Sequence, residues 1–320
     1  MNSYSLTLPS FAKVNWSVRL LGRRPDGYHE VRTILQTISI QDDLEFEVTR
    51  DGSIDLTCEQ PDIPTDNRNL IVRAANALKQ RYHVAEGARI RLVKRIPAQA
   101  GLGGGSSNAA VSLLTLAHLW KTSATGAELL DIAARLGADV PFFLLGGVAL
   151  GTGTGATVSA LADDDERRIP HLIVIKPNAT VSTAAAYAAM NLPALTTKKQ
   201  DPILSNSQTS ANSEDSQPWP LSDLFLSESQ NDFEAVIFDI EPEIRRARDT
   251  LLQAGALGAL LAGSGSSVFG IFADAEAQQR GIKEIQAEAG WRIFPCVTLS
   301  RDEYRRQIGL ELFHFFEKGQ

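Results

Sequence analysis

Alternating apolar and polar positions open the chain. Over residues 12–20 every second residue is apolar, and Lys13 and Asn15 stand between apolar neighbours. A period of two residues is typical of a strand with one buried face, so these two polar side chains are predicted to project from the same face. Similar patterning predicts strands over residues 31–40 and 43–48.

Helical periodicity then alternates with short apolar runs. The segment 125–128 has capping-box spacing and predicts a helix that Gly137 closes. Asp239 is a possible cap of a later helix, which Gly255 would end. Further helices are predicted over residues 70–82, 106–120, 182–190, 242–254 and 274–288, and strands over 89–96, 146–155, 171–176 and, on either side of a Gly-Ser turn, 259–272. This mixture predicts an α+β or α/β protein rather than a helical bundle.

The pattern restarts after about residue 160, which predicts one domain over residues 1–160 and a second over residues 161–320. A chain of 320 residues is long enough for two domains. Residues 196–223 are rich in Ser, Asn, Gln and Pro and have few apolar anchors, so they are predicted to be a mobile excursion.

Composition narrows the class of protein. Hydrophobic residues make up 43% of the chain and charged residues 22%, the balance of an ordinary globular protein. The net charge of -7 argues against nucleic-acid or anionic-membrane partners. Cys58 and Cys296 lack the spacing of a metal or redox motif, and no signal pattern or long apolar run is present. We therefore expect a cytoplasmic protein with no nucleic-acid or membrane partner.

The most informative motif runs from Pro97 to Ala110 and places four glycines and two serines between a predicted strand and a predicted helix. Backbone N–H groups and the positive end of the helix form an anion site there, and glycines allow close approach to phosphate oxygens. The Lys-Ser/Thr of a Walker A loop and the acidic residue of a dinucleotide fingerprint are both absent. The motif predicts a nucleotide-phosphate site, and a glycine-rich turn that serves only packing is the alternative.

Phosphoryl transfer to an alcohol also needs positive charge and a proton acceptor. Asp139 stands among apolar neighbours, which suits a general base, although it could instead cap the short helix that Val140-Pro141 begins. Lys13 is unusual in mid-strand and could orient Asp139 and offset charge on the γ-phosphate. An exposed face of an edge strand is the alternative for Lys13.

Two turns could contact a substrate. Asp26-Gly27 predicts a tight turn that places Tyr28 and His29 at a rim. A stacking face and a donor–acceptor pair suit a heterocyclic base, although such a pair can also be purely structural. The Gly/Ser turn over residues 262–267 could contact phosphate or substrate across the cleft, or be a plain hairpin turn.

Together these segments resemble the GHMP kinases (galactokinase, homoserine kinase, mevalonate kinase and phosphomevalonate kinase). Three blocks stand in the family order, at residues 12–15, 101–107 and 263–267. Segments 24–30 and 136–141 resemble the branch that phosphorylates 4-diphosphocytidyl-2-C-methyl-D-erythritol. The resemblance implies a two-domain α+β fold, with an N-terminal domain like domain 2 of ribosomal protein S5, a C-terminal ferredoxin-like α/β domain and the active site between them.

The resemblance also implies an activity: ATP-dependent phosphorylation of the tertiary 2-hydroxyl of that cytidine-diphosphate alcohol, in the non-mevalonate pathway of isoprenoid synthesis. ATP and Mg²⁺ are the expected cofactors, and a monomer or weak homodimer is expected.

The resemblance also assigns roles to individual residues. Asp139 corresponds to the base and Lys13 to its activating partner, in a contact of about 3 Å. Tyr28 and His29 correspond to residues that hold the cytosine, and Tyr187 to a second aromatic residue that sandwiches it. The ATP-binding residues implied are Pro97, Ala98, Gln99, Ala100, Gly101, Leu102, Gly103, Gly104, Gly105, Ser106, Ser107, Asn69 and Leu70; the substrate-binding residues are Asn15, Tyr28, His29, Tyr187, Gly263 and Ser264; Ser107 is the predicted metal ligand.

Three positions depart from the family pattern. Trp16 replaces a smaller aliphatic residue, which alters the packing behind Lys13. Gln99 stands where the loop usually has a small residue, so the outer edge of the phosphate cradle can differ. Asn108 takes the place of an aspartate, which argues against a metal role there.

Two other functions are compatible with parts of this sequence. The first is a GHMP kinase acting on homoserine or mevalonate, and the Tyr28-His29 pair argues against it because those substrates carry no base to stack. The second is a nucleotide-binding protein without catalysis. The presence of both Lys13 and Asp139 argues against that, because a pure binder needs neither.

Overall fold

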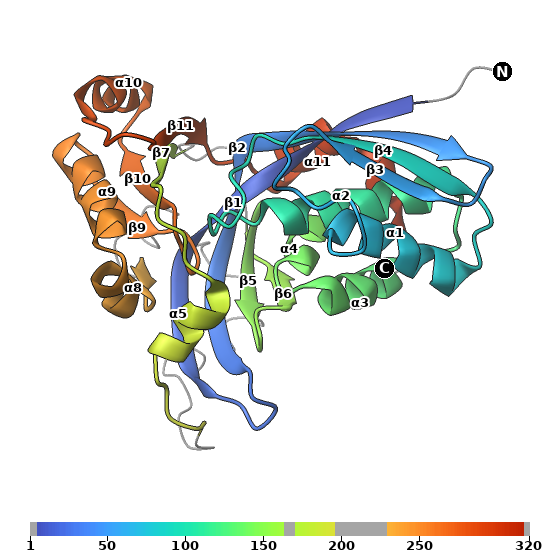
Figure 1. The fold of residues 1–320 in the computed structure, drawn as a ribbon, viewed down its shortest axis with the longest axis horizontal. Helices are drawn as coiled ribbons and strands as arrows, with labels where there is room; N and C mark the ends of the chain where they lie inside the picture. Colours follow the sequence, from blue (N-terminus) through green and yellow to red (C-terminus); the bar gives the residue numbers. More distant parts are fainter. Residues whose placement is uncertain (1–4, 163–169, 196–228, 317–320) are drawn as a thin grey trace, which may run out of the picture.

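The computed structural model describes residues 5–162, 170–195 and 229–316, so the predicted excursion over 196–223 lies outside the described residues. Within these ranges the strands form two sheets (Figure 1). The first contains β1 (Ser5–Arg23), β2 (His29–Thr49), β3 (Ile54–Cys58), β4 (Gly87–Val93), β5 (Val148–Thr152), β6 (Thr157–Ala160) and β8 (Gln230–Asn231). Its order is β3-β4-β2-β1-β8, and β5 pairs with β2 and β6. The second sheet, in the order β11-β7-β10-β9, contains β7 (His171–Lys176), β9 (Gly258–Leu261), β10 (Val268–Phe272) and β11 (Arg292–Val297).

The helices divide between the two sheets. The first sheet is covered by α1 (Leu70–Tyr82), α2 (Gly104–Leu119), α3 (Gly126–Leu136) and α4 (Val140–Leu145) (Figure 1). The elements α5 (Thr183–Ala189), α8 (Glu234–Ile240), α9 (Pro242–Gln253) and α10 (Ala275–Glu284) lie on the side of the second sheet. The chain then returns to the first core through α11 (Arg301–Ile308) and the 3-10 helix η1 (Leu310–Phe316). None of the helices in the described residues has the length and apolar character needed to cross a membrane.

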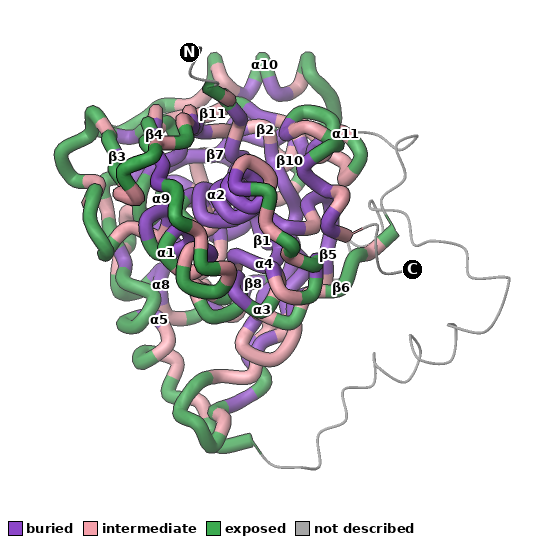
Figure 2. Tube along the Cα trace, turned by 90° about the vertical axis from the view of Figure 1, so that its right-hand side faces the viewer, coloured by how far each residue is buried: buried purple, intermediate pink, exposed green. Residues whose placement is uncertain are grey.

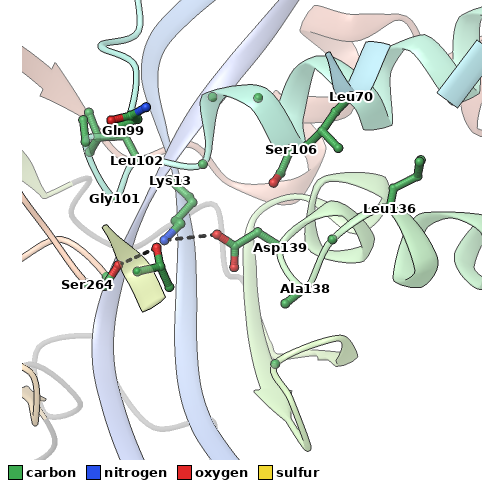
Figure 3. A pocket seen from close by; sticks show the side chains of 18 of the residues that line it. Lys13, Leu70, Gln99, Gly101, Leu102, Ser106, Leu136, Ala138, Asp139 and Ser264 are labelled. Atoms are coloured by element: carbon green, nitrogen blue, oxygen red, sulfur yellow. Dashed lines mark hydrogen bonds and ion pairs between the residues drawn. The ribbon is translucent and has the colours of Figure 1, made fainter. Parts of the chain in front are cut away.

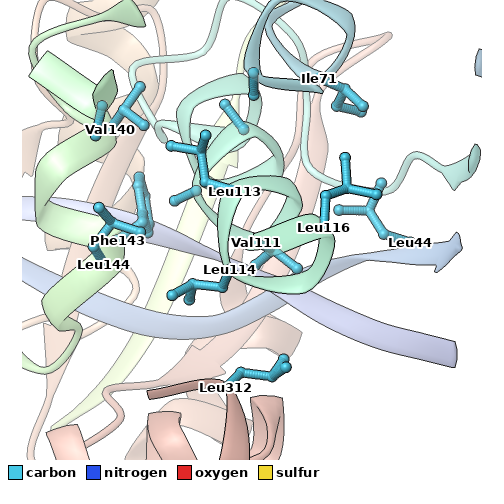
Figure 4. Close-up of a cluster of buried hydrophobic side chains, with 14 of the residues drawn as sticks. Leu44, Ile71, Val111, Leu113, Leu114, Leu116, Val140, Phe143, Leu144 and Leu312 are labelled. Carbon is cyan, nitrogen blue, oxygen red and sulfur yellow. The ribbon is translucent and has the colours of Figure 1, made fainter. Parts of the chain in front are cut away.

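The helix α2 lies at the centre of the larger core. It is apolar on nearly all sides because it packs against the first sheet and against α1, α3, α4 and η1. In Figure 4 its side chains extend in different directions, Leu116 toward Leu44 of β2 and Leu113 toward Val140 of α4. Figure 2 shows that this buried region continues through β1 and β7 toward the second sheet. The start of α2, which carries glycines, is therefore fixed in place by the packing of the helix in this core.

The strands β1 and β2 are longer and more deeply buried than the sequence pattern predicts. The predicted break after residue 40 is absent, because Gln41 and Asp42 stay paired with Phe11 and Ser10 of β1. Bulges absorb the irregular register, the first of them between Phe11 and the next residue. The polar face of residues 13–17 is also buried, so the expectation of a strand with one exposed face was wrong.

Local signals placed several elements correctly. The helix over 70–82 is α1, the strand over 171–176 is β7, and the capping box of α3 and its end at Gly137 are confirmed. Asp239 lies inside α8 and caps nothing, because α9 begins with proline at its first position after Glu241. The prediction also ran α10 four residues too far and missed β3, β6, β8, β11, α8, α11 and η1.

Candidate active site

The glycine loop joins β4 to α2 and lines a cavity of about 1220 Å³. The helix begins at Gly104, two residues before the predicted start, with Gly103 as its N-cap. No side chain among the described residues caps α2, so the N–H groups of its first turn are left for a ligand or water. Gly105 has open space at its Cβ position, with Leu70 Cδ1 the nearest atom at 3.9 Å. These features are those of an anion site at a helix N-terminus.

Gly101 and Gly103 have a second requirement for glycine. Both adopt positive φ angles, 75° and 70°. A Cβ on Gly101 would lie 1.9 Å from the carbonyl oxygen of Ala262, and one on Gly103 would lie 3.0 Å from Lys13 Cγ. The loop is therefore in close contact both with the turn that follows β9 and with β1, so packing alone already requires glycine at these two positions.

Lys13 and Asp139 meet at the floor of the cavity (Figure 3). The distance between Lys13 Nζ and Asp139 Oδ2 is 3.4 Å, and the same ammonium donates to Asn15 Oδ1 at 2.7 Å. Only 4% of the Lys13 side chain is exposed, compared with 36% for Asp139. The predicted contact is confirmed. The alternative of an exposed edge-strand face for Lys13 is wrong, because its side chain is buried and its backbone N–H donates to the carbonyl oxygen of Leu102.

Asp139 occupies the N-cap position of α4, but its side chain makes no capping hydrogen bond. Pro141, in the first turn, lacks an N–H group and so lowers the need for a cap. The carboxylate faces the cavity and Lys13 instead (Figure 3). Its orientation suits a proton acceptor better than a helix cap.

Aromatic side chains form one rim of the cavity. Arg24 joins Asp26 at 3.1 Å and Glu30 at 2.6 Å and so braces the turn that presents Tyr28, which is 67% exposed. His29 stacks on Tyr187 with ring centroids 4.7 Å apart, which leaves no room for a base between these two rings. Burial, with a smaller contribution from Asp139, raises the pKa of Tyr187 to about 12.

The Gly/Ser turn is a hairpin turn between β9 and β10 that also lies close to Lys13. A Cβ on Gly263 would lie 3.2 Å from Lys13 Nζ. Asn231 holds this turn by donating to the carbonyl oxygens of Leu261 and Gly263 at 2.8 and 2.7 Å. Ser264 bonds to Thr183 at the start of α5, with 3.1 Å between the hydroxyl oxygens. The hairpin interpretation of the turn is confirmed, and the contact with phosphate or substrate stays a prediction.

The predicted site residues come together, with one exception. Within the described part of the chain, Ser107 does not line the cavity. Its hydroxyl is fully buried and accepts a hydrogen bond from Ser10 at 2.8 Å, so its prediction as the metal ligand was wrong. Asn108 is also buried and donates to Asp42 and to Ser10. Ser106 faces the cavity in place of Ser107 (Figure 3).

Comparison with known proteins identifies the family. The GHMP kinases N terminal domain matches residues 69–147, and the GHMP kinases C terminal domain matches residues 220–290. The 4-diphosphocytidyl-2-C-methyl-D-erythritol kinase of Pelotomaculum thermopropionicum is 40% identical over 86% of this chain and 92% of its own length. That of Solibacter usitatus is 40% identical over 93% of this chain and 90% of its own. The chain belongs to the 4-diphosphocytidyl-2-C-methyl-D-erythritol kinase family.

Solved structures agree with membership of this family. A crystal structure of 4-(cytidine 5'-diphospho)-2C-methyl-D-erythritol kinase matches with a TM-score of 0.70 and 32% identity, over 92% of this chain and 99% of that one. A homoserine kinase from Cytophaga hutchinsonii matches with a TM-score of 0.66 at 18% identity, over 94% and 98% of the two chains, and shows the fold alone. The α+β fold expected of a GHMP kinase is confirmed.

Several residues that shape the site of this family member carry no local signal in the sequence. Asn231 follows a long polar segment, and nothing nearby marks it as the anchor of the turn at Gly263. Thr33 of β2 accepts from Asn15 Nδ2 at 2.8 Å and so orients the amide beside Lys13. These contacts join segments far apart in the chain.

Proposed function

We propose that this protein transfers the γ-phosphoryl group of ATP to the 2-hydroxyl of 4-diphosphocytidyl-2-C-methyl-D-erythritol, a step of non-mevalonate isoprenoid synthesis. The observation that carries the proposal is the contact between Lys13 and Asp139, placed between the glycine loop and the aromatic rim of one cavity. Membership of the family names the alcohol, and this geometry supplies the groups that the transfer requires.

Asp139 acts as the general base. As the hydroxyl oxygen attacks the γ-phosphorus, the bond from that phosphorus to the bridging oxygen of ADP breaks, and the hydroxyl proton passes to the carboxylate. Lys13 orients Asp139 and offsets the charge on the transferring group, helped by the free N–H groups at the start of α2. Burial of Lys13 strengthens this attraction because water is excluded from it.

The two substrates would bind at different ends of the cavity. Asn69 caps α1 through a hydrogen bond from Ile71 N at 2.9 Å, and with Leu70 it forms the wall beside the glycine loop, where the adenine would bind. Tyr28 and Tyr187 stand at the opposite rim, where the cytosine would stack. Asn15 and Gly263 lie between them, beside the catalytic pair.

Magnesium fits the donor set of this cavity. Mg²⁺ is usually held by one or two carboxylates together with substrate phosphates and water. Among the described residues no cluster of three or more ligating side chains is found, so a site made of protein alone is not expected there. Asp139 and the Ser106 hydroxyl face the cavity and would hold an ion carried by the nucleotide. When bound, the ion would neutralise charge on the β- and γ-phosphates.

The domain division belongs to this proposal: residues 1–160 form the unit with the glycine loop and the catalytic pair, and residues 161–320 form the second unit. The turn at Gly263 brings the second unit to the site, and α11 and η1 pack back on the core of the first. The cytoplasmic location and the state of a monomer or weak homodimer stay predictions.

The test is an acceptor comparison. The protein is incubated with ATP and Mg²⁺ and either the cytidine-diphosphate alcohol, mevalonate or homoserine, and ADP release is followed. We expect turnover with the first acceptor and none above background with the others. Turnover on mevalonate or homoserine without turnover on the cytidine-diphosphate alcohol would contradict the proposal.

A further inference from the structure

Asp42 is a fully buried carboxylate that the proposed transfer does not use. It lies in β2, directly before Asp43. The pair of Asp43 and Val93 is the last one of the ladder between β2 and β4 at this end. At this point Asp42 Oδ1 accepts the backbone N–H groups of Arg95 and Ile96, at 2.7 and 2.8 Å. The side chain thus replaces the sheet as the partner of these two amides. This replacement also explains why the predicted strand over 89–96 ends early.

The second oxygen of the carboxylate reaches the other end of the loop. Asp42 Oδ2 accepts from Lys94 Nζ at 2.5 Å and from Asn108 Nδ2 at 2.9 Å. Asn108 also donates to Ser10 Oγ at 2.9 Å, and the Ser10 hydroxyl in turn donates to Ser107 at 2.8 Å. One carboxylate is therefore bonded on both sides of the glycine loop.

The residues between these attachment points line the cavity, and Lys94 and Asn108 line it as well. Residues 97–106 form its phosphate side. Residues 94–96 and Asn108 are bound to Asp42 of β2, and Ser107 and Asn108 are bound to Ser10 of β1. Lys94 also lies close to the start of α2, since a Cβ on Gly104 would be 2.8 Å from Lys94 Nζ. A buried carboxylate is costly unless it is paired and fully hydrogen-bonded. Here every bond it accepts comes from the flanks of the glycine loop.

We propose that Asp42 is a positioning residue that fixes the shape of the glycine loop for the nucleotide. The proposal rests on the proposed function, because it assigns the loop to ATP. It predicts that loss of the Asp42 carboxylate weakens the binding of ATP selectively. The binding of the acceptor alcohol, at the rim formed by Tyr28 and Tyr187, should be nearly unchanged.

The first test is Asp42→Asn. An amide can accept through one oxygen only, so at least two of the four donors lose their partner or face another donor. Titration with ATP in the absence of acceptor should show affinity weakened about ten-fold or more, at a folded fraction matched to wild type by circular dichroism. The KM of the acceptor, measured at saturating ATP, should stay within about two-fold of wild type.

Glu243→Gln is the matched control. The Glu243 carboxylate accepts three hydrogen bonds, from the backbone N–H groups of Asn178 and Ala179 and from Trp291 Nε1, and it does not line the cavity. This variant also disturbs hydrogen bonds that a carboxylate accepts from backbone and side-chain N–H groups, so it should lose stability, while its affinity for ATP stays at the wild-type value. Equal losses of ATP affinity in the two variants would overturn the proposal.

Ser10→Ala keeps the proposal testable if Asp42→Asn does not fold. It removes only the hydroxyl that joins Asn108 to Ser107, and it should weaken ATP about three-fold with the acceptor KM unchanged. ATP affinity at the wild-type value in Ser10→Ala, or an equal rise in both KM values in either variant, would refute the positioning role. Failure of the wild-type protein to bind ATP would instead refute the proposed function, so the two failures are distinguishable.

Discussion

Lys13 Nζ lies 3.4 Å from Asp139 Oδ2, although the lysine belongs to the middle of β1 and the aspartate to the turn that begins α4. A third segment joins them, since the Cβ position of Gly263 is 3.2 Å from the same ammonium. The glycine loop completes the group, because Lys13 N donates to the carbonyl of Leu102 at 2.9 Å. Four segments that are distant in the chain therefore meet at one ion pair, and both members of this pair line the cavity.

Lys13→Met should lower kcat by roughly 10²–10³-fold, because the variant loses the positive charge that orients Asp139 and offsets phosphoryl charge. Lys13→Arg should not restore the rate, since Gly263 and Asn15 leave no room for a guanidinium beside the ion pair. Steady-state ADP release measures both variants. The control is Lys176→Met, whose buried ammonium donates to the carbonyl oxygens of Pro177 and Ala179 away from the cavity, and it should lower stability with little effect on kcat. A Lys13→Met enzyme with kcat near wild type would refute this role.

Two glycine substitutions separate packing from ligand binding. Gly101→Ala should lower the Tm of the ligand-free protein, because its φ is positive and the new Cβ would lie 1.9 Å from Ala262 O. Position 105 has open space for a Cβ and a helical backbone. Gly105→Ala should therefore leave the free energy of unfolding of the ligand-free protein unchanged or raise it by up to about 1 kcal/mol, and its Tm should not fall. ATP affinity should nevertheless fall, since the methyl group occupies the phosphate side of the cavity. A Gly105→Ala protein that binds ATP as tightly as wild type would place the phosphates elsewhere.

Tyr28→Ala should raise the KM of the cytidine-diphosphate alcohol about ten-fold, because a stacking face for the base is lost. The KM of ATP should not change, and neither should the Tm, since Tyr28 is 67% exposed. Leu257→Ala, at a side chain that is 73% exposed and lies outside the cavity, serves as the control and should change neither constant. An effect confined to the KM of ATP would contradict the cytosine site.

Much of the candidate site was predictable because its signals are local. The alternation along β1 placed Lys13 and Asn15 on one face, and the capping box of α3 fixed the helix before Asp139. The glycine loop was recognisable from its composition, and all of its predicted residues except Ser107 line the cavity. Ser107 was misassigned because sequence alone does not show which side of a helix start faces the core.

The remaining features depend on contacts between distant segments. Asp42 seemed to fall in a gap between two strands, because its polar neighbours interrupt the alternation that marks a strand. Its partners at residues 94–96 and at Asn108 come from other elements, so no local pattern reveals them. The same holds for Asn231, whose bonds to the turn at Gly263 cross from one sheet to the other.

The most direct test is Asp139→Asn in a single-turnover assay. The variant and wild type are each mixed with ATP, Mg²⁺ and the cytidine-diphosphate alcohol, and phosphorylated product is quantified alongside ATP affinity measured on the same preparation. Loss of the base should slow transfer roughly 10²–10⁴-fold while ATP affinity stays near wild type. Asp131→Asn, on the exposed face of α3, is the control and should transfer at the wild-type rate. Transfer by Asp139→Asn at a rate close to wild type would show that the ion pair of Lys13 and Asp139 is not the centre of the reaction.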